Sequence, residues 1–143
     1  MRWQLVDKIL ECDAGKSAVG VKTFSPDDEI FLDHFPGYPR VPGVLLIEMM
    51  ATVSGFALRA TDPNLAIIFC MIKGAKFSRF VKPGEPCTIR SRVESYVGSL
   101  AIFDASVEVD GVTAASAKIV STTDGIRVEN DPLDRLTADW LKK

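Results

Sequence analysis

The sequence is short of the residue types that most metal sites and disulfide frameworks require. Its 143 residues include three cysteines and one histidine. Cys12, Cys70 and Cys87 form no closely spaced pair of the metal-binding kind. We therefore expect reduced thiols, no metal and no cofactor. The formal net charge of −2 provides no overall attraction to nucleic acid or to an anionic membrane, so neither is expected as a partner.

Long hydrophobic segments and targeting signals are also lacking. The first residues carry charges at Arg2, Asp7 and Lys8, inside the stretch where a signal peptide would be apolar. The most apolar segment, residues 44–60, is too short and too interrupted to span a bilayer, which needs about 20 apolar residues. These features predict a single cytoplasmic domain covering residues 1–143.

What the chain does contain is one stretch, residues 33–61, in which the only histidine precedes a proline-rich loop and an apolar helix. His34 opens the loop, which is expected to run over residues 30–41. Pro42 predicts the helix start, and apolar residues on nearly every face over 44–60 predict a buried helix. Glu48 lies within it. By itself the pattern leaves open whether this carboxylate is buried or reaches the surface along a narrow polar edge.

The rest of the chain reads as antiparallel strands and one further helix. Alternating apolar residues and turn signals predict strands over residues 3–12, 17–24, 65–81, 88–97, 100–109 and 112–122. The unbroken apolar run over 65–72 predicts a strand buried on both faces. One long helix with about six antiparallel strands indicates an α+β domain.

Two shorter helical segments are also expected. Ser25, followed by Pro26, predicts a capped turn of helix. Asp131 and Pro132 predict the start of a C-terminal helix over about residues 131–141. Its apolar residues recur at helical spacing, which favours docking against the body or against a partner subunit over a frayed terminus. These residues are Leu133, Leu136, Trp140 and Leu141.

The loop and the start of the helix, HFPGYPRVPGVLLIE, closely resemble the signature of the bacterial 3-hydroxyacyl-(acyl-carrier-protein) dehydratases. The block KFSRFVKPGE, Lys76 to Glu85, and the VDG of Val109 to Gly111 are similar to later parts of the same family. The resemblance runs from about residue 5 to about residue 122. The matching positions of the first block are His34, Phe35, Pro36, Gly37, Pro39, Pro42, Gly43, Val44 and Glu48.

This resemblance implies a hotdog fold, in which an antiparallel sheet wraps around one long central helix. It implies a lyase that dehydrates 3-hydroxyacyl thioesters in fatty-acid or related biosynthesis, works with acyl carrier protein, and forms a homodimer or a higher assembly of dimers. The glutamate at position 48 resembles the branch of the family that only dehydrates. Two departures stand out: Thr52 replaces the usual glutamine, and the chain lacks the usual PHRYPF-like lead-in.

The chemistry of water elimination matches the residues in this stretch. A base must take a proton from C2, an acid must protonate the leaving 3-hydroxyl, and donors must stabilise the thioester oxygen. The ordinary pKa of histidine is about 6.5, which suits His34 as the base, and apolar surroundings would keep a proton on Glu48 as the acid. The N–H groups of Gly43 and Val44 at the helix start suit an oxyanion. The family assigns the same roles and takes the histidine and the carboxylate of one site from different subunits.

Two further questions stay open at this stage. Lys73, Lys76, Arg79 and Lys82 form either a docking surface for an acidic carrier protein or a solvated strand face. The alternatives to a dehydratase are a hotdog acyl thioesterase and a non-catalytic hotdog protein that binds acyl chains or scaffolds a complex. The HFPG and PGV motifs argue against the thioesterase, whereas Thr52 keeps the non-catalytic alternative open.

Overall fold

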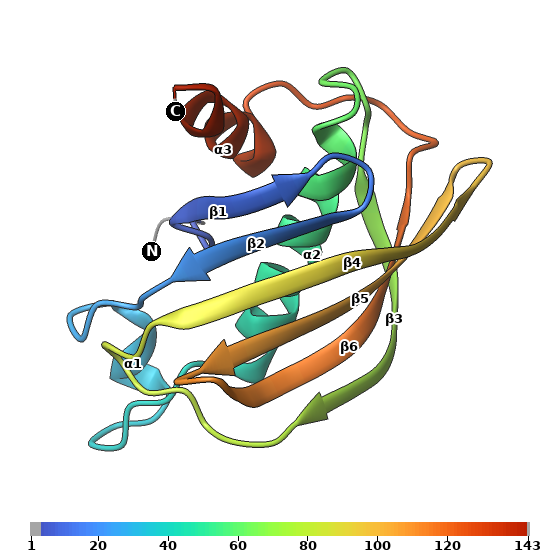
Figure 1. The fold of residues 1–143 in the computed structure, drawn as a ribbon. Coiled ribbons are helices and arrows are strands. Elements are labelled where there is room, and N and C mark those ends of the chain that lie inside the picture. Colours follow the sequence, from blue (N-terminus) through green and yellow to red (C-terminus); the bar gives the residue numbers. More distant parts are fainter. Residues whose placement is uncertain (1–3, 143) are drawn as a thin grey trace.

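A curved antiparallel sheet surrounds one long helix in the computed structural model, which describes residues 4–142 (Figure 1). The order of strands in the sheet is β1-β2-β4-β5-β6-β3. This arrangement confirms the predicted α+β class with a sheet wrapped around a central helix. The strands are β1 (Lys8–Asp13), β2 (Ser17–Lys22), β3 (Ile68–Phe77), β4 (Cys87–Val97), β5 (Leu100–Val109) and β6 (Val112–Thr122). The helices are α1 (Ile30–Asp33), α2 (Gly43–Arg59) and α3 (Pro132–Leu141).

Helix α2 forms the centre of the core. Pro42 precedes its first residue with φ −57° and ψ 134°, a position where the missing N–H group costs no hydrogen bond. The side chains of Met49, Met50 and Val53 are completely buried against the sheet. A Cβ atom on Gly20 of β2 would lie 3.0 Å from Cγ2 of Val53, so glycine lets the sheet approach the helix closely here.

Strand β3 corrects the prediction of a strand buried on both faces. It occupies one edge of the sheet, beside β6, and every residue in it except the half-buried Ile72 is exposed. It is also shorter than predicted, because the N–H groups of Ser78 and Arg79 both bond to the carbonyl of Ala114 and the regular ladder ends there. An apolar run indicates burial but does not say which element provides the cover, and within residues 4–142 none covers β3.

Two predictions for the N-terminal third need correction. Strand β1 begins at Lys8 rather than at residue 3, which lies outside the described residues. Ser25 caps no helix, because its hydroxyl accepts from the N–H of Asp27 at 3.2 Å in a local turn. The helical turn is α1 instead, where Asp28 Oδ1 accepts from the N–H of Ile30 at 3.1 Å. Residues 30–33, predicted as loop, are therefore helical.

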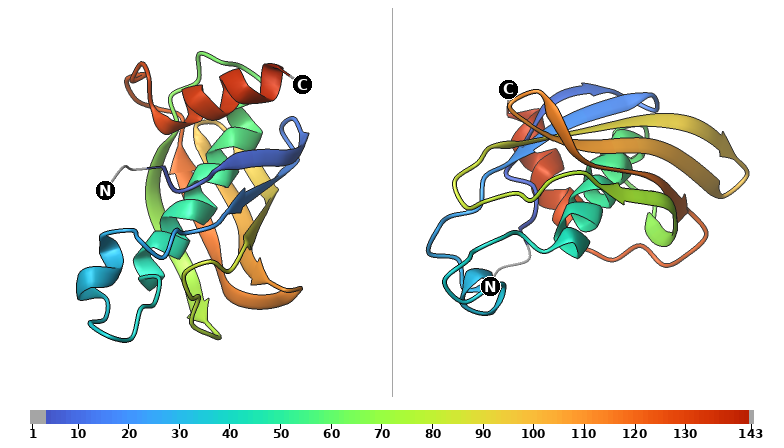
Figure 2. Two further views of the ribbon diagram at one scale, coloured as in Figure 1. Left: turned by 90° about the vertical axis from the view of Figure 1, so that its left-hand side faces the viewer. Right: turned by 90° about the horizontal axis from the view of Figure 1, so that it is seen from below.

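Helix α3 lies across the C-terminal end of α2, and α1 lies near its other end (Figure 2). The side chain of Asp131 caps α3 by accepting from the N–H of Asp134 at 3.1 Å. Leu133 and Leu136 are buried in the core. Trp140 is half-buried and meets the ring of Phe56 edge-on, with centroids 6.3 Å apart.

A buried arginine ties α3 to α2. Arg59, at the last position of α2, is only 2% exposed. Its guanidinium lies 2.8 Å from the carboxylate of Asp131 and 3.3 Å from that of Asp134. Arg127, in the segment between β6 and α3, also pairs with Asp134. Because a buried charge needs its partners, these ion pairs fix the position of α3 over the helix end.

Candidate active site

His34 directly follows α1, and a backbone carbonyl holds its ring. Nδ1 of His34 lies 3.0 Å from the carbonyl oxygen of Arg40. A carbonyl oxygen can only accept, so Nδ1 carries the proton in the neutral ring and Nε2 keeps its lone pair. The imidazole stacks on Phe35 with ring centroids 4.0 Å apart. This arrangement presents Nε2 as a base.

The loop after His34 is closed by its own hydrogen bonds. The N–H of Phe35 bonds to the carbonyl of Tyr38 at 3.0 Å, and the N–H of Tyr38 bonds back at 2.8 Å. Gly37 has φ +71°, a conformation that favours glycine. The guanidinium of Arg40 stacks on Tyr38 at 3.5 Å, and the N–H of Val41 bonds to the carbonyl of Val81 at 2.8 Å. The proline-rich loop is thus an anchored turn that orients the imidazole.

His34 and the start of α2 line the same cavity, which has a volume of about 290 Å³. Gly43 lines this cavity together with Phe77. A Cβ atom on Gly43 would lie 3.0 Å from the Phe77 ring, so only glycine fits here without displacing the ring. The first N–H groups of a helix have no partner within it and carry the positive end of its dipole. At Gly43 and Val44 these groups can stabilise an oxyanion beside His34, and Val44, 70% exposed, contributes only its backbone.

Glu48 lines a different pocket, of ≈ 170 Å³, together with Thr52, Gly55 and Phe69. Its side chain is half-buried, whereas its neighbour Met49 is completely buried. Successive helical residues point about 100° apart at 3.6 residues per turn, so Glu48 and Met49 face different surroundings. Within one chain, His34 and Glu48 therefore line two separate pockets.

Thr52 stands where the resemblance leads one to expect glutamine. Its hydroxyl donates to the carbonyl of Glu48 at 2.8 Å, and its side chain lines the same pocket as Glu48. This bond back to the helix backbone is typical of threonine in a helix. Thr52 therefore contributes a short side chain, bonded to its own helix, to the wall of the pocket.

The four basic residues considered as a docking surface lie in different surroundings. Lys73 and Lys76 are exposed on β3 and line a pocket that reaches β5 and β6. Arg79 is half-buried, lines the His34 cavity and pairs with Glu85 at 2.7 Å. Lys82 is exposed in the turn that follows. Of the four, only Arg79 contacts the cavity that contains His34.

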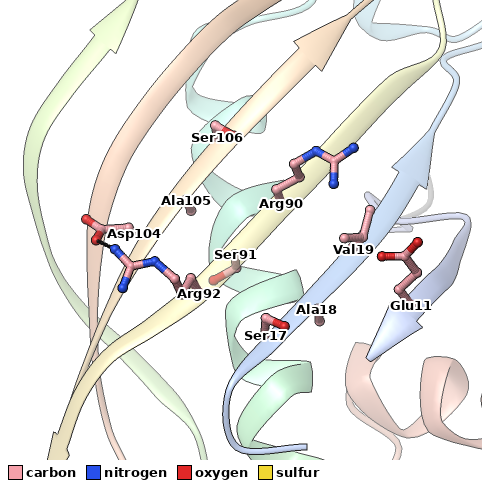
Figure 3. A pocket seen from close by; sticks show the side chains of 10 residues that line it. All are labelled: Glu11, Ser17, Ala18, Val19, Arg90, Ser91, Arg92, Asp104, Ala105 and Ser106. Carbon is pink, nitrogen blue, oxygen red and sulfur yellow. Dashed lines mark hydrogen bonds and ion pairs between the residues drawn. The ribbon is translucent and has the colours of Figure 1, made fainter. Parts of the chain in front are cut away.

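A further pocket, of ≈ 390 Å³, lies on the face of the sheet that points away from α2 (Figure 3). Two of its charged side chains, those of Arg92 and Asp104, form an ion pair at 2.6 Å. Neither His34 nor Glu48 lines it. Within residues 4–142 there is no group of three or more His, Cys, Asp or Glu side chains able to hold a metal ion. Over the same residues, every helix is too short or too polar to cross a membrane.

Several residues of the two pockets were not predicted from the sequence. Phe77 and Phe80 line the His34 cavity, and Ile67 and Leu133 line the Glu48 pocket. Leu133 was expected to dock against the body, but nothing in its local pattern indicates which pocket it reaches. One available signal was Gly55, a glycine inside a strongly apolar helix, which points to a close approach by another element.

Comparison with known proteins identifies the family. A family model described as a FabA-like domain matches residues 1–118. The 3-hydroxyacyl-(acyl-carrier-protein) dehydratase FabZ of Bacillus pumilus is 40% identical over 117 residues, which cover 80% of this chain and 81% of that protein.

Solved structures agree on the fold. The dehydratase heterocomplex ApeI:P of Xenorhabdus doucetiae has a TM-score of 0.70 at 12% identity, covering 100% of this chain and 93% of that chain. A hypothetical thioesterase from Streptococcus pneumoniae, solved with coenzyme A, has a TM-score of 0.64 at 12% identity, covering 85% and 88%. Such likenesses show the hotdog fold alone, and the sequence match identifies the family. The chain belongs to the FabA-like family.

Proposed function

We propose that this protein is a hydro-lyase that converts 3-hydroxyacyl thioesters, carried on acyl carrier protein, into trans-2-enoyl thioesters in fatty-acid or related acyl-chain biosynthesis. The observation that carries the proposal is His34, whose Nε2 is left as a base in a cavity that also contains the start of α2. The 40% identity to a FabZ dehydratase supports the same reaction.

The proposed reaction uses three groups of the chain. Nε2 of His34 takes the proton from C2, and the electrons of that C–H bond form the C2=C3 double bond. The C3–O bond breaks as Glu48 donates its proton, so the hydroxyl leaves as water. The N–H groups of Gly43 and Val44 stabilise the charge on the thioester oxygen. Passage of the proton from His34 back to Glu48 restores the starting state.

We propose that each active site combines His34 of one subunit with Glu48 of the other in a homodimer. The support is the separation of the two residues into different pockets within one chain. Strand β3 supplies a means of pairing, because it is an open sheet edge with exposed apolar side chains such as Phe69 and Met71. Phe69 also lines the Glu48 pocket, so a partner paired along β3 would lie next to Glu48.

The reaction is tested with purified protein and a crotonyl thioester. Hydration removes the conjugated double bond, so the absorbance of the enoyl thioester should fall while the amount of free thiol stays constant. Release of free thiol would identify a thioesterase. No change in either signal would support an acyl-binding or scaffolding protein. Either of these two results would overturn the proposed reaction.

The shared site is tested by mixing two inactive variants, His34→Ala and Glu48→Gln. Each should lose roughly 10²- to 10⁴-fold in activity, the usual contribution of a general acid or base. After subunit exchange, each mixed dimer should regain one intact site, because two-fold symmetry places both substitutions in the other site. If exchange is demonstrated by mass spectrometry and activity does not return, both groups act within one chain.

A further inference from the structure

We propose that the C-terminal helix α3 determines the length of acyl chain that the enzyme accepts, with the side chain of Leu133 as the end wall of the alkyl pocket. The inference rests on the proposed function, because it takes the Glu48 pocket as the place of the acyl tail. It assigns a specificity role to a segment outside the residues that match the family model, 1–118.

The Glu48 pocket has the shape needed for a short alkyl chain. Glu48 and Gly55 both line it and are seven positions apart along α2, or about 10 Å at 1.5 Å per residue. Apolar side chains, including those of Ile67 and Phe69, also line it. Because Glu48 donates to the 3-hydroxyl in the proposed reaction, the acyl chain beyond C3 starts beside Glu48 and can extend into this pocket.

Leu133 closes the far end of the pocket. A Cβ atom on Gly55 would lie 3.2 Å from Cδ1 of Leu133 and 3.3 Å from Cγ2 of Ile67, so there is no free space at this point. Leu133 is itself only 7% exposed, which leaves it little freedom to move aside. An extended chain advances about 1.2 Å per bond, so about eight carbons beyond C3 would fill the pocket.

Ion pairs as well as packing hold Leu133 in position. Asp131, next to Pro132 at the start of α3, also lines the pocket, and its carboxylate lies 2.8 Å from the buried guanidinium of Arg59. Asp134 pairs with the same guanidinium at 3.3 Å. These pairs join the first turn of α3 to the end of α2, so the position of Leu133 relative to Gly55 is fixed.

The experiment compares Leu133→Ala with a matched control, Leu136→Ala. Both leucines are buried on α3, but Leu136 does not line the pocket. The ratio of kcat/KM for a fourteen-carbon over a six-carbon 3-hydroxyacyl thioester should rise roughly tenfold in Leu133→Ala. The variant frees room for about two more methylenes, and burial of each gives about fourfold. Leu136→Ala should leave the ratio unchanged. An unchanged ratio in Leu133→Ala, or an equal rise in both variants, would overturn the proposal.

A third variant distinguishes a change in pocket length from a loss of folding. Leu133→Phe shortens the pocket and should lower the same ratio, so opposite shifts from one position could not arise from unfolding. Circular dichroism and thermal melting establish that each variant is folded. If Leu133→Phe leaves the kcat/KM ratio at the wild-type value, the proposal that Leu133 limits chain length is wrong.

Failure of the proposed reaction can be told apart from failure of this inference. If wild-type protein does not dehydrate even the six-carbon substrate, the proposed function is wrong. Calorimetry with amide analogues of the six- and fourteen-carbon thioesters then still tests whether Leu133 limits chain length. A rise in relative affinity for the longer analogue in Leu133→Ala alone would support it, and equal affinity ratios in wild type and Leu133→Ala would overturn it.

Discussion

At the scale of single residues, one backbone carbonyl decides which nitrogen of His34 can act as a base. Because the carbonyl of Arg40 occupies Nδ1, the lone pair of the neutral ring is on Nε2. The loop that places Arg40 is closed by reciprocal bonds between Phe35 and Tyr38. The chemistry proposed for this residue thus depends on the conformation of the loop around it as much as on the imidazole itself.

The role of Gly43 leads to a prediction at the same scale. In Gly43→Ala, the added Cβ atom would meet the Phe77 ring at 3.0 Å and crowd the N–H groups proposed to hold the thioester oxygen. We expect kcat/KM for dehydration to fall roughly 10²- to 10³-fold, as for loss of one oxyanion donor. Val44→Ala keeps its N–H group and should retain activity close to that of wild type. Equal activity in Gly43→Ala would exclude this role.

At the scale of elements, α3 is attached to α2 through ion pairs that depend on pH. The hydrogen bond from Arg127 holds the pKa of Asp134 below its ordinary value, and the neighbouring positive charges of Arg127 and Arg59 act in the same direction. A carboxyl group whose pKa is lower in the folded state stabilises the fold above its unfolded pKa. That contribution is lost as the pH falls through the folded pKa. The attachment of α3 should therefore weaken in acid.

This pH dependence can be measured with Asp134→Asn. The variant should be less stable than wild type at pH 7, and the difference in unfolding free energy should shrink below about pH 4, where the unfolded carboxyl becomes protonated. Urea titrations at pH 7 and pH 3 provide the comparison. Asp139→Asn is the matched control, because Asp139 forms only an exposed pair with Arg135 at 3.6 Å. A stability difference that is the same at both pH values would contradict this account.

At the scale of the whole molecule, the open edge at β3 is the main feature that one chain leaves incomplete. Its exposed apolar residues are costly in water and lie next to the Glu48 pocket. Pairing of two β3 edges would cover these apolar residues. It would also bring a second chain, with its own His34, next to Glu48. Assembly and activity should therefore be lost together.

A charged residue introduced on β3 tests the link between assembly and activity. Met71→Lys places a charge on β3, where the side chain is 49% exposed, without changing a residue that lines either pocket. We expect a monomer by light scattering and loss of dehydration. Leu10→Lys is the control, since Leu10 is also exposed but lies on β1 at the opposite edge of the sheet. An active monomer of Met71→Lys would show that a single chain is sufficient.

The charged surface of the whole molecule should affect how it meets the carrier protein. We propose that Lys73, Lys76, Arg79 and Lys82 attract the acidic carrier protein, with Arg79 closest to the His34 cavity. Lys76→Glu should weaken use of carrier-protein substrates, more strongly at low salt, and should spare small thioester analogues. Arg90→Glu, on the face of the sheet away from α2, should affect neither. Equal losses on both substrate types in Lys76→Glu would indicate a folding role.

The sequence by itself determined the features that depend on local periodicity and on the HFPG motif. Helix α2 begins and ends within one residue of its predicted limits, and β4, β5 and β6 follow the alternating runs closely. These predictions succeed because backbone conformation and the spacing of apolar residues are short-range properties. The resemblance in residues 34–48 likewise identified the family before any contact was known.

Only the tertiary structure decided which residues share a pocket. It separated His34 from Glu48, exposed the apolar run of β3, and placed Leu133 against Gly55, 78 positions earlier in the chain. No local pattern contains this information, because burial depends on which distant element, or which second chain, covers a given face. Contacts between residues far apart in sequence follow from how the sheet curves around α2 and where its edges are left open.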